Sequence, residues 1–275
     1  NYLGSEDFFS LVSNTAGGYS FYRDARMRRL TRYRYNNSPL DMDGHRIYIK
    51  DGDTVWNPGW QPTKTPLDSY SCRHGLGYTV VEGKKDGVTA RQELFVPKGD
   101  ACELDRLTLT NRSDRPRELD VFGYVEFCLW DAVDDSTNFQ RNFSTGEVEV
   151  EPGVIYHKTE YRERRDHYAM FWSNTPVTSF DTTRDAFCGV YGGPADPQAV
   201  RAGHCSGSIA HGWAPVGALH IHVTLAPGEE KKILFGLGYI ENPQDEKFSA
   251  SGVINKTRAH AMMARYATDA QVDAA

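Results

Sequence analysis

The stretch ELDVFGYVEFCLW, residues 118–130, alternates apolar and polar side chains, and this period of two is typical of a β-strand with one face in a core. The expected core face consists of Leu119, Val121, Gly123, Val125, Phe127 and Leu129. The other face carries Glu118, Asp120, Phe122, Tyr124, Glu126, Cys128 and Trp130. Acids beside aromatic rings are costly in a dry core unless they are paired. We therefore expect this second face to be wet and concave.

Similar segments extend in both directions from this strand. A strand over 104–110 and a polar turn over 111–117 precede it, and the valines and glutamates of 147–151 alternate as in a half-buried strand. Residues 220–225 and 232–239 also have strand patterns, and the turn sequence Ala226-Pro227-Gly228-Glu229 between them predicts a hairpin. With 25 glycines and 13 prolines punctuating short segments, the chain is predicted to be all-β, a large antiparallel sandwich.

Helix signals gather at the end of the sequence. Asn242 and Pro243 offer an N-cap and a proline for a first helical turn. Residues 245–267 are polar and rich in alanine, so we expect a C-terminal helical segment there, although Gly252 weakens its middle. Residues 23–34 are expected to form strand and turn, because Thr31 and the neighbouring tyrosines favour extended backbone.

Composition excludes several classes of protein. The 275 residues carry a net charge of −6 and no basic stripe, which argues against nucleic-acid binding. No run of about 18 apolar residues exists, so we expect no membrane-spanning helix. The five cysteines are Cys72, Cys102, Cys128, Cys188 and Cys205. Their odd number and the lack of a CxxC pair predict reduced, mostly buried thiols in a cytoplasmic protein, with no disulfide framework and no metal site.

The strand runs directly into LWDAVDDSTNFQRN, residues 129–142. Paired carboxylates such as those of Asp131, Asp134 and Asp135 can cleave glycosidic bonds, but adjacent aspartates more often serve as turn and cap residues. A binding loop is the stronger functional interpretation, because aromatic faces, amides and carboxylates recognise sugar hydroxyl groups. The predicted sugar-binding residues are Trp130, Asp131, Asn138, Gln140 and Arg141. An ordinary surface loop remains the alternative.

Two further clusters allow a functional and a structural interpretation. Arg162, Arg164 and Arg165 could contact an anion or a partner, or could form exposed ion pairs of little energetic weight. His220 and His222 lie two residues apart on one strand face, which could place two imidazoles on a metal. No third ligand is evident nearby, so surface histidines without metal are the favoured interpretation.

Five long stretches carry a resemblance to a known family. They are NYLGSEDFFSLVSNTAGGYSFYRDARMRRLTRYRYNN (1–37), RHGLGYT (73–79), YVEFCLWDAVDDSTNFQRNFSTGEVEVE (124–151), IYHKTEYRERRDHYA (155–169) and LGYIENPQDEK (237–247). With these stretches the chain resembles the inverting disaccharide phosphorylases of glycoside hydrolase family 94, in their cellobiose phosphorylase branch. The likeness extends over nearly the whole sequence.

The resemblance implies an N-terminal β-supersandwich of the galactose mutarotase type over residues 1–241 and the start of a helical linker over 242–275. It further implies a catalytic (α/α)₆ barrel that is absent from this chain. In this family, phosphate converts cellobiose to α-glucose 1-phosphate and glucose with inversion, and one aspartic acid of the barrel protonates the glycosidic oxygen. No catalytic residue and no cofactor is therefore expected here, and inorganic phosphate is a co-substrate.

The family is homodimeric, and its N-terminal domain reaches the active-site mouth of the partner subunit. The positions that match Asp131 and Asn138 lie at that mouth, on the side of the acceptor sugar. Relatives commonly carry asparagine in place of Asp131, which leaves open how this chain treats acceptors. Gln140 and Arg141 are carried over with less support.

Two other functions stay open from the residues alone. A stand-alone carbohydrate-binding module would use the rings of Phe122, Tyr124 and Trp130. A mutarotase-like epimerase would need a glutamate base and a histidine acid, for which Glu126 and His157 are loose candidates.

Overall fold

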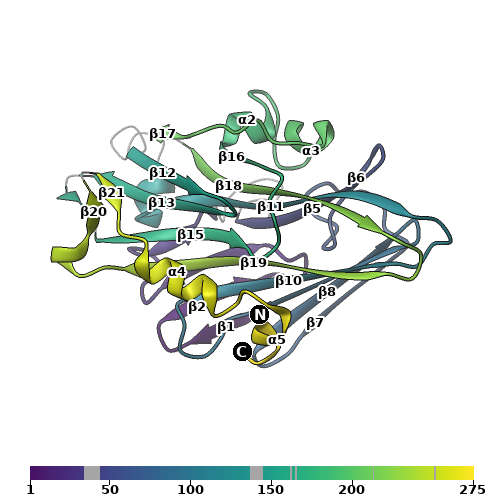
Figure 1. Cartoon of the computed structure of the whole chain (residues 1–275), viewed down its shortest axis with the longest axis horizontal. Coiled ribbons are helices and arrows are strands. Elements are labelled where there is room, and N and C mark those ends of the chain that lie inside the picture. Colours follow the sequence, from purple (N-terminus) through teal and green to yellow (C-terminus); the bar gives the residue numbers. More distant parts are fainter. Residues whose placement is uncertain (34–43, 137–144, 162, 165, 213, 251) are drawn as a thin grey trace.

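The computed structural model describes residues 1–33, 44–136, 145–161, 163–164, 166–212, 214–250 and 252–275. Within these residues, two large antiparallel sheets stack face to face, and short helices lie on their outer surfaces (Figure 1). The predicted all-β class and its large antiparallel sandwich are confirmed.

The first sheet contains nine of the described strands, in the order β1-β2-β3-β4-β11-β18-β16, with β5 paired to β11 and β6 paired to β5. Its strands are β1 (Tyr2–Ser5), β2 (Phe8–Val12), β3 (Gly18–Tyr22), β4 (Arg29–Thr31), β5 (His45–Asp51), β6 (Thr54–Trp56), β11 (Arg117–Trp130), β16 (Ser179–Thr183) and β18 (Pro215–Leu225). The predicted strand and turn over the described part of 23–34 are confirmed by the turn before β4.

The second sheet contains ten of the described strands, in the order β17-β12-β13-β15-β19-β10-β9-β8-β7, with β14 paired to β13. Its strands are β7 (Ser69–His74), β8 (Tyr78–Lys85), β9 (Val88–Phe95), β10 (Cys102–Asn111), β12 (Thr145–Glu151), β13 (Val154–Tyr161), β14 (Glu163–Arg164), β15 (His167–Ser173), β17 (His211–Gly212) and β19 (Glu230–Glu241). The half-buried strand predicted over 147–151 is confirmed as part of β12.

The main core lies between the sheets and is built by alternating side chains of both. Leu119 and Val121 of β11 meet Leu107 and Leu109 of β10 in one buried apolar cluster. All six positions of the expected core face of β11 are buried, Gly123 among them. Because β11 pairs with β18, β5 and β4, it forms the centre of its sheet.

The hairpin predicted from 220–225 and 232–239 has the right strands but the wrong pairing, and the strands on either side of the turn at 111–117 do not pair either. β18 and β19 belong to different sheets, and so do β10 and β11. The two connections instead arch side by side across the edge of the sandwich. Asn111 joins them, since its N–H donates to Glu229 O at 3.0 Å and its carbonyl accepts from Gly228 N at 2.8 Å. Turn chemistry shows that the chain reverses, but it does not show which sheet the next strand joins.

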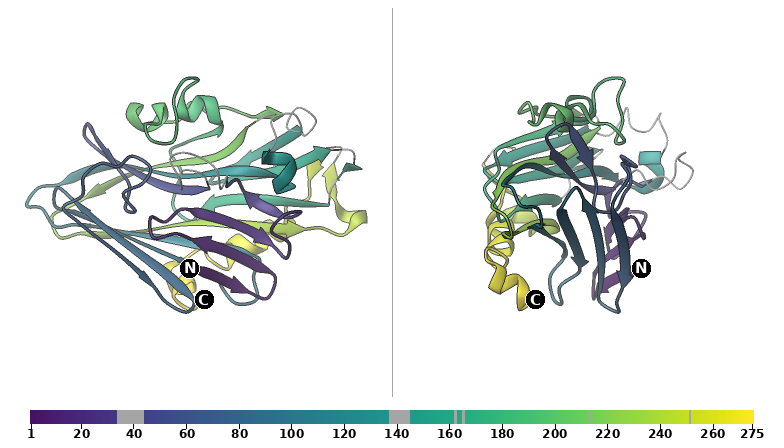
Figure 2. Two further views of the ribbon diagram at one scale, coloured as in Figure 1. Left: turned by 180° about the vertical axis from the view of Figure 1, so that it is seen from behind. Right: turned by 90° about the vertical axis from the view of Figure 1, so that its right-hand side faces the viewer.

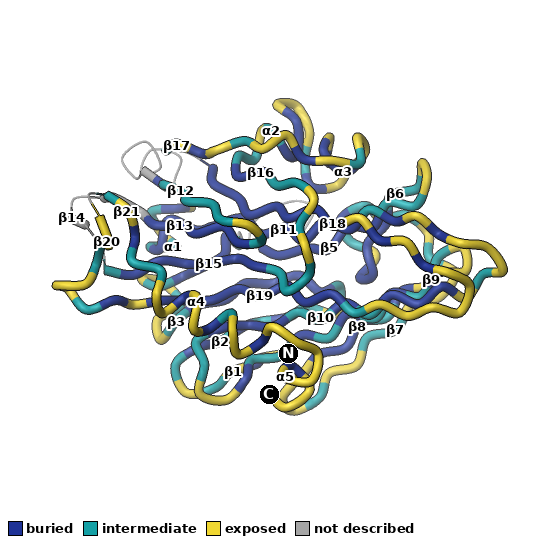
Figure 3. Tube along the Cα trace, in the orientation of Figure 1, coloured by how far each residue is buried: buried dark blue, intermediate teal, exposed yellow. Residues whose placement is uncertain are grey.

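Two helical segments cover the outside of the sandwich, one on each sheet (Figure 2). α2 (Arg184–Cys188) and α3 (Gln198–Ala202) pack on β5, β11 and β18. α4 (Thr257–Ala264) and α5 (Asp269–Asp273) bring Met262, Tyr266 and Val272 onto the outer face of the second sheet. The exposed residues therefore gather in turns and on the free sides of these helices (Figure 3).

The C-terminal segment is helical over a shorter range than predicted. Only a 3₁₀ turn, η2 (Gln244–Glu246), follows Pro243. β20 (Phe248–Ala250) and β21 (Val253–Ile254) then form a small ladder around Gly252, whose φ of 77° suits a turn and not a helix. The predicted helix over 245–267 is therefore wrong before Thr257. The division at residue 241 stays a prediction.

Candidate functional site

The candidate sugar-binding segment begins where β11 leaves its regular pairing. Phe127 pairs with Thr31 of β4, and Trp130 pairs with Arg29. Between these two pairs β11 contains one residue more than β4, which is a β-bulge. This bulge and a φ of 67° at Trp130 turn its side chain to the face of Phe127. The sequence alternation placed Trp130 on the opposite face with Tyr124 and Glu126, and that assignment is wrong.

Trp130 is fully buried. Its indole meets the rings of His167 and Tyr239 edge to face, with centroids 4.5 and 5.7 Å away, and lies nearly parallel to His157 at 6.4 Å. Its Nε1 finds no hydrogen-bond partner among the described residues. The ring therefore packs under the base of the loop, and in the described part of the chain it presents no open face to a sugar.

Asp131 is the one residue between β11 and the short helix α1 (Ala132–Ser136). Its Oδ1 accepts hydrogen bonds from the backbone of Val133 at 2.8 Å and of Asp134 at 3.1 Å, as an N-cap does. Its side chain is 13% exposed, and Arg26 Nε lies 3.9 Å from the same oxygen. One carboxylate oxygen thus holds the turn, and the other accepts no hydrogen bond from a described residue.

Asp135, at the other side of the same turn, is buried in an ion pair. Arg32, just past β4, donates from Nε to Asp135 Oδ2 at 2.9 Å and from Nη2 to Oδ1 at 3.2 Å. Arg32 Nη1 also lies 3.6 Å from Glu126 Oε2. The second oxygen of Glu126 accepts from Tyr124 Oη at 2.7 Å and from Arg184 Nε at 3.2 Å. Two arginines and two carboxylates therefore balance their charges at the base of the loop.

Burial and charge act in opposite directions on the pKa of Arg32 and in the same direction on the pKa of Tyr124. Burial disfavours the charged guanidinium of Arg32, but the carboxylates of Asp135 and Glu126 outweigh it, so the pKa of Arg32 is raised. Burial also raises the pKa of Tyr124 well above its ordinary value, and the neighbouring Glu126 adds to this, so Tyr124 stays a neutral donor. Arg32 and Arg184 carry no signal in the sequence that links them to the loop, because only folding brings them there.

Three of the predicted site residues, Asn138, Gln140 and Arg141, lie outside the described residues, as do Arg162 and Arg165 and the side chain of Arg164. Of the five predicted sugar-binding residues, the structure therefore places Trp130 and Asp131.

The expected wet face of β11 is largely dry, and that expectation is wrong. Phe122, Tyr124, Glu126 and Cys128 are buried. Phe187 of α2 stacks on Tyr124 with a centroid distance of 4.5 Å, and the α2–α3 segment closes this side of the sheet. A carbohydrate-binding module built on these rings and Trp130 is therefore contradicted, because none of the rings is accessible.

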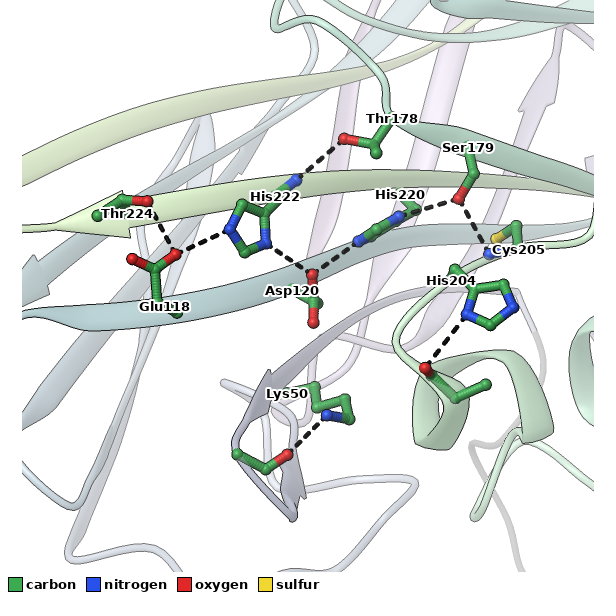
Figure 4. Close-up of polar contacts among 12 residues, drawn as sticks. Lys50, Glu118, Asp120, Thr178, Ser179, His204, Cys205, His220, His222 and Thr224 are labelled. Atoms are coloured by element: carbon green, nitrogen blue, oxygen red, sulfur yellow. Dashed lines mark hydrogen bonds and ion pairs between the residues drawn. The ribbon is translucent and has the colours of Figure 1, made fainter.

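The wet part of this face is the start of β11, where acids meet the two histidines of β18 (Figure 4). Asp120 Oδ1 lies 2.9 Å from His220 Nε2 and 2.9 Å from His222 Nδ1, and Glu118 Oε2 lies 2.8 Å from His222 Nε2. Since both nitrogens of His222 face carboxylates, the ring is satisfied as an imidazolium. The hydrogen bond to Asp120, aided by Glu118, raises the pKa of His222.

The imidazoles are thus paired with carboxylates. Among the residues that the structure describes, no group of three or more His, Cys, Asp or Glu side chains is arranged to hold a metal ion.

Glu126 and His157 do not form an acid–base pair for epimerase chemistry. Glu126 lies in the ion network of the outer face, whereas His157 lies between the sheets and stacks on Phe127 at 4.8 Å. Burial lowers the pKa of His157 to about 3, so its imidazole is neutral. That interpretation is wrong. The five cysteines are free thiols, and all but Cys72 are buried, as predicted.

Comparison with known proteins identifies relatives across nearly the whole chain. The family described as "Glycosyl hydrolase 94, supersandwich domain" matches residues 1–269. An N,N'-diacetylchitobiose phosphorylase of Vibrio furnissii is 36% identical over 100% of this chain and 33% of its own length. A solabiose phosphorylase of Paenibacillus borealis is 35% identical over 84% of this chain and 30% of its own length. The chain thus spans about a third of the length of these curated relatives.

Solved structures of low sequence identity share the fold. A galactose mutarotase-like protein of Lactobacillus casei is similar with a TM-score of 0.50 at 8% identity, over 87% of this chain and 99% of its own. A bacterial glucoamylase gives a TM-score of 0.51 at 7% identity, over 86% of this chain and 31% of its own. Within the described residues, no helix has the length and apolar character needed to cross a membrane.

Proposed function

Because this chain belongs to the glycosyl hydrolase 94 supersandwich-domain family, we propose that it is the N-terminal β domain of an inverting disaccharide phosphorylase. The observation that carries the proposal is the family match over residues 1–269, together with curated relatives that are disaccharide phosphorylases. In the proposed reaction, phosphate cleaves a disaccharide to a sugar 1-phosphate and a free sugar. We take cellobiose as the substrate, which gives α-glucose 1-phosphate and glucose.

The proposed role of this domain is to hold the acceptor sugar and not to carry out catalysis. The described acids of the loop support this division, since Asp131 caps α1 and Asp135 is locked to Arg32. Proton donation to the glycosidic oxygen would come from a catalytic (α/α)₆ barrel outside this chain. No cofactor is needed, because phosphate is itself a competent nucleophile and replaces the base-activated water of an inverting hydrolase.

The proposed site is the segment that follows β11. Asp131 and Asn138 would form a wall of the acceptor site at the mouth of the active site of a homodimer partner, with Gln140 and Arg141 beside them. Trp130 would act from beneath, by packing the base of the segment. The free thiols agree with the proposed cytoplasmic location, where cysteines stay reduced.

The test compares two proteins under one assay. The full-length polypeptide that carries this domain is expected to release sugar 1-phosphate from phosphate and one member of a panel of cellobiose, N,N'-diacetylchitobiose and solabiose. The isolated 275-residue chain is expected to release none. Phosphorolysis by the isolated chain would refute the non-catalytic role, and inactivity of the full-length protein on every disaccharide would refute the proposed function. A strong preference for another disaccharide would refute only the assignment of cellobiose.

A further inference from the structure

Arg32 connects the part of β11 before its bulge with the helix α1 that follows the bulge. Its backbone N–H donates to Glu126 O at 2.8 Å, before the bulge, and its guanidinium grips Asp135 in α1, after the bulge. A planar guanidinium bound to both oxygens of a carboxylate fixes direction as well as distance. The side chain of Arg32 therefore helps to fix α1 relative to β11, together with the backbone hydrogen bond from Ala132 N to Arg26 O at 2.7 Å.

The position of Asp135 affects the position of Asp131, because a hydrogen bond links the two residues. Asp135 N donates to Asp131 O at 2.9 Å within the turn, and Asp135 Oδ1 lies 3.4 Å from Leu129 N on the other side of it. The Asp131 carboxylate caps the same turn. A change in the position of Asp135 would thus move the oxygen of Asp131 that no described residue occupies.

Stability alone is a weak explanation for so costly an arrangement. Arg32 is 6% exposed and Asp135 is 3% exposed, so both charges have lost their water. The desolvation of a buried ion pair often cancels its attraction, and apolar replacements of similar volume are frequently as stable. What apolar side chains do not reproduce is the two-point geometry.

From these contacts we propose that Arg32 is a positioning residue for acceptor recognition. It acts through Asp135 to hold the Asp131 carboxylate toward the acceptor sugar. The sugar hydroxyl groups would donate hydrogen bonds to the oxygen of this carboxylate that accepts none from a described residue. The inference rests on the proposed function and adds to it a residue that never touches the sugar.

The experiment measures acceptor recognition in the full-length enzyme, in the synthetic direction, with glucose as acceptor and α-glucose 1-phosphate as donor. The test variant is the double substitution Arg32→Met with Asp135→Leu, which removes both charges together and leaves Glu126 paired with Arg184. The matched control is Arg117→Met with Asp51→Leu. In that pair, with 2.7 Å between Nη1 and Oδ2, Arg117 is buried and Asp51 is partly buried, and it lies at the opposite end of β11.

The test variant is expected to raise the KM for glucose about tenfold, equivalent to about 1.4 kcal/mol, the size of one hydrogen bond to a charged group. The KM for α-glucose 1-phosphate and the kcat are expected to stay within about twofold, because the proposed function places the donor sugar and the chemistry on the barrel outside this chain. Arg32→Lys keeps the positive charge but loses the two-point hydrogen bonding of the guanidinium to Asp135, so an intermediate KM for glucose is expected. The control pair is expected to leave all three constants unchanged.

The possible results distinguish the positioning role of Arg32 from the acceptor contact of Asp131 and from the phosphorylase activity. If Asp131→Ala raises the KM for glucose and the test variant does not, Arg32 positions nothing and the inference is overturned. If Asp131→Ala has no effect, Asp131 is not an acceptor contact, and the inference falls while the phosphorylase activity stands. A full-length enzyme without phosphorolysis would overturn the proposed function itself. Should the double variant fold poorly in thermal melts, Arg32→Lys, which retains the ion pair, provides the same comparison.

Discussion

Asp105 and Gln92 meet between the two sheets, where Gln92 Nε2 donates a hydrogen bond of 2.7 Å to Asp105 Oδ2. Asp105 Oδ1 is buried and has no hydrogen-bond partner among the described residues. Burial raises the pKa of Asp105 well above its usual value, and the nearby carboxylate of Glu103 raises it further. The sandwich therefore contains an acid that favours its neutral form.

We expect Asp105→Asn to stabilise the protein at neutral pH. An acid whose pKa is raised on folding makes the folded state lose stability as pH rises from the unfolded pKa, near 3.8, toward the folded pKa. An amide carries no such penalty, so the free energy of unfolding should rise at pH 7 by on the order of 1 kcal/mol or more. Urea unfolding at pH 7 and at pH 3.5 measures this, and the gain should vanish at the lower pH.

Glu93→Gln on the neighbouring strand is the matched control, with the opposite sign. Burial alone would raise the pKa of Glu93, but hydrogen bonds from Arg91 and Arg106 outweigh it and the pKa is lowered. The stability from this carboxylate is present above its unfolded pKa and lost as pH falls, so the variant should be less stable at pH 7. An equal response of both variants would mean that burial of Asp105 does not govern its ionisation.

The contacts of His222 with Asp120 and Glu118 predict that the stability of the protein depends on pH near neutrality. The pKa of His222 is raised on folding, so its contribution is fully present below the unfolded pKa, near 6.5, and is lost as pH rises through the folded pKa. Because the side chain is 48% exposed, solvent screening keeps the effect below about 1 kcal/mol. Comparison of His222→Gln with the parent should therefore show a loss of stability at pH 5.5 that disappears at pH 9.

An NMR titration of the His222 ring checks the cause independently. Glu118→Gln removes the carboxylate that lies 2.8 Å from Nε2 and should lower the pKa of His222. A titration curve that does not move in this variant would contradict the proposed imidazolium bridge.

The sequence predicted those features of β11 that depend on the strand alone. Its core face follows from a period of two, which a strand obeys wherever it lies. The bulge before Trp130 depends on the pairing with β4, and the dryness of Phe122 and Tyr124 depends on α2 and α3, which come much later in the chain. Neither the bulge nor the burial of these two rings can therefore be predicted from residues 118–130 alone.

The candidate site shows the same division between local and distant information. The acids and amides of 129–142 predicted a binding loop, which stays a prediction, and the expectation that the aspartates act as turn and cap residues is confirmed for Asp131. Arg32 lies 103 residues before Asp135 and looked like one of several arginines in a basic segment. Only the sheet order, which places β4 beside β11, brings it to the loop.

Gly123 at the centre of β11 is predicted to be intolerant of any side chain. An added Cβ would lie 2.5 Å from two carbons of the Phe235 ring, in the middle of the core. Overpacking of this kind costs about 1–3 kcal/mol, so Gly123→Ala should lower the free energy of unfolding by that amount. Gly77→Ala should change the free energy of unfolding little, because no atom of the described residues lies within 4 Å of a Cβ added there. Equal effects in urea unfolding would contradict the tight contact.

The charge network at Arg32 predicts that one substitution is worse than two. Arg32→Met alone leaves Asp135 charged and buried without its main partner, and should cost about 3–5 kcal/mol. Adding Asp135→Leu removes that charge and should recover most of the loss, which a double-mutant cycle in urea measures. If the two losses simply add, the residues do not act as a pair.

Trp130 offers the sharpest contrast between a core residue and a sugar platform. Its indole is fully buried against His167 and Tyr239, so Trp130→Ala should destabilise the isolated chain by about 3–5 kcal/mol, as the loss of a large core side chain does. Trp60, which is 40% exposed, is the matched control, and Trp60→Ala should cost much less because little packing is lost. Guanidinium unfolding followed by far-UV circular dichroism measures both variants. A Trp130→Ala protein that kept its stability while losing acceptor affinity in the full-length enzyme would show instead that the indole faces the sugar.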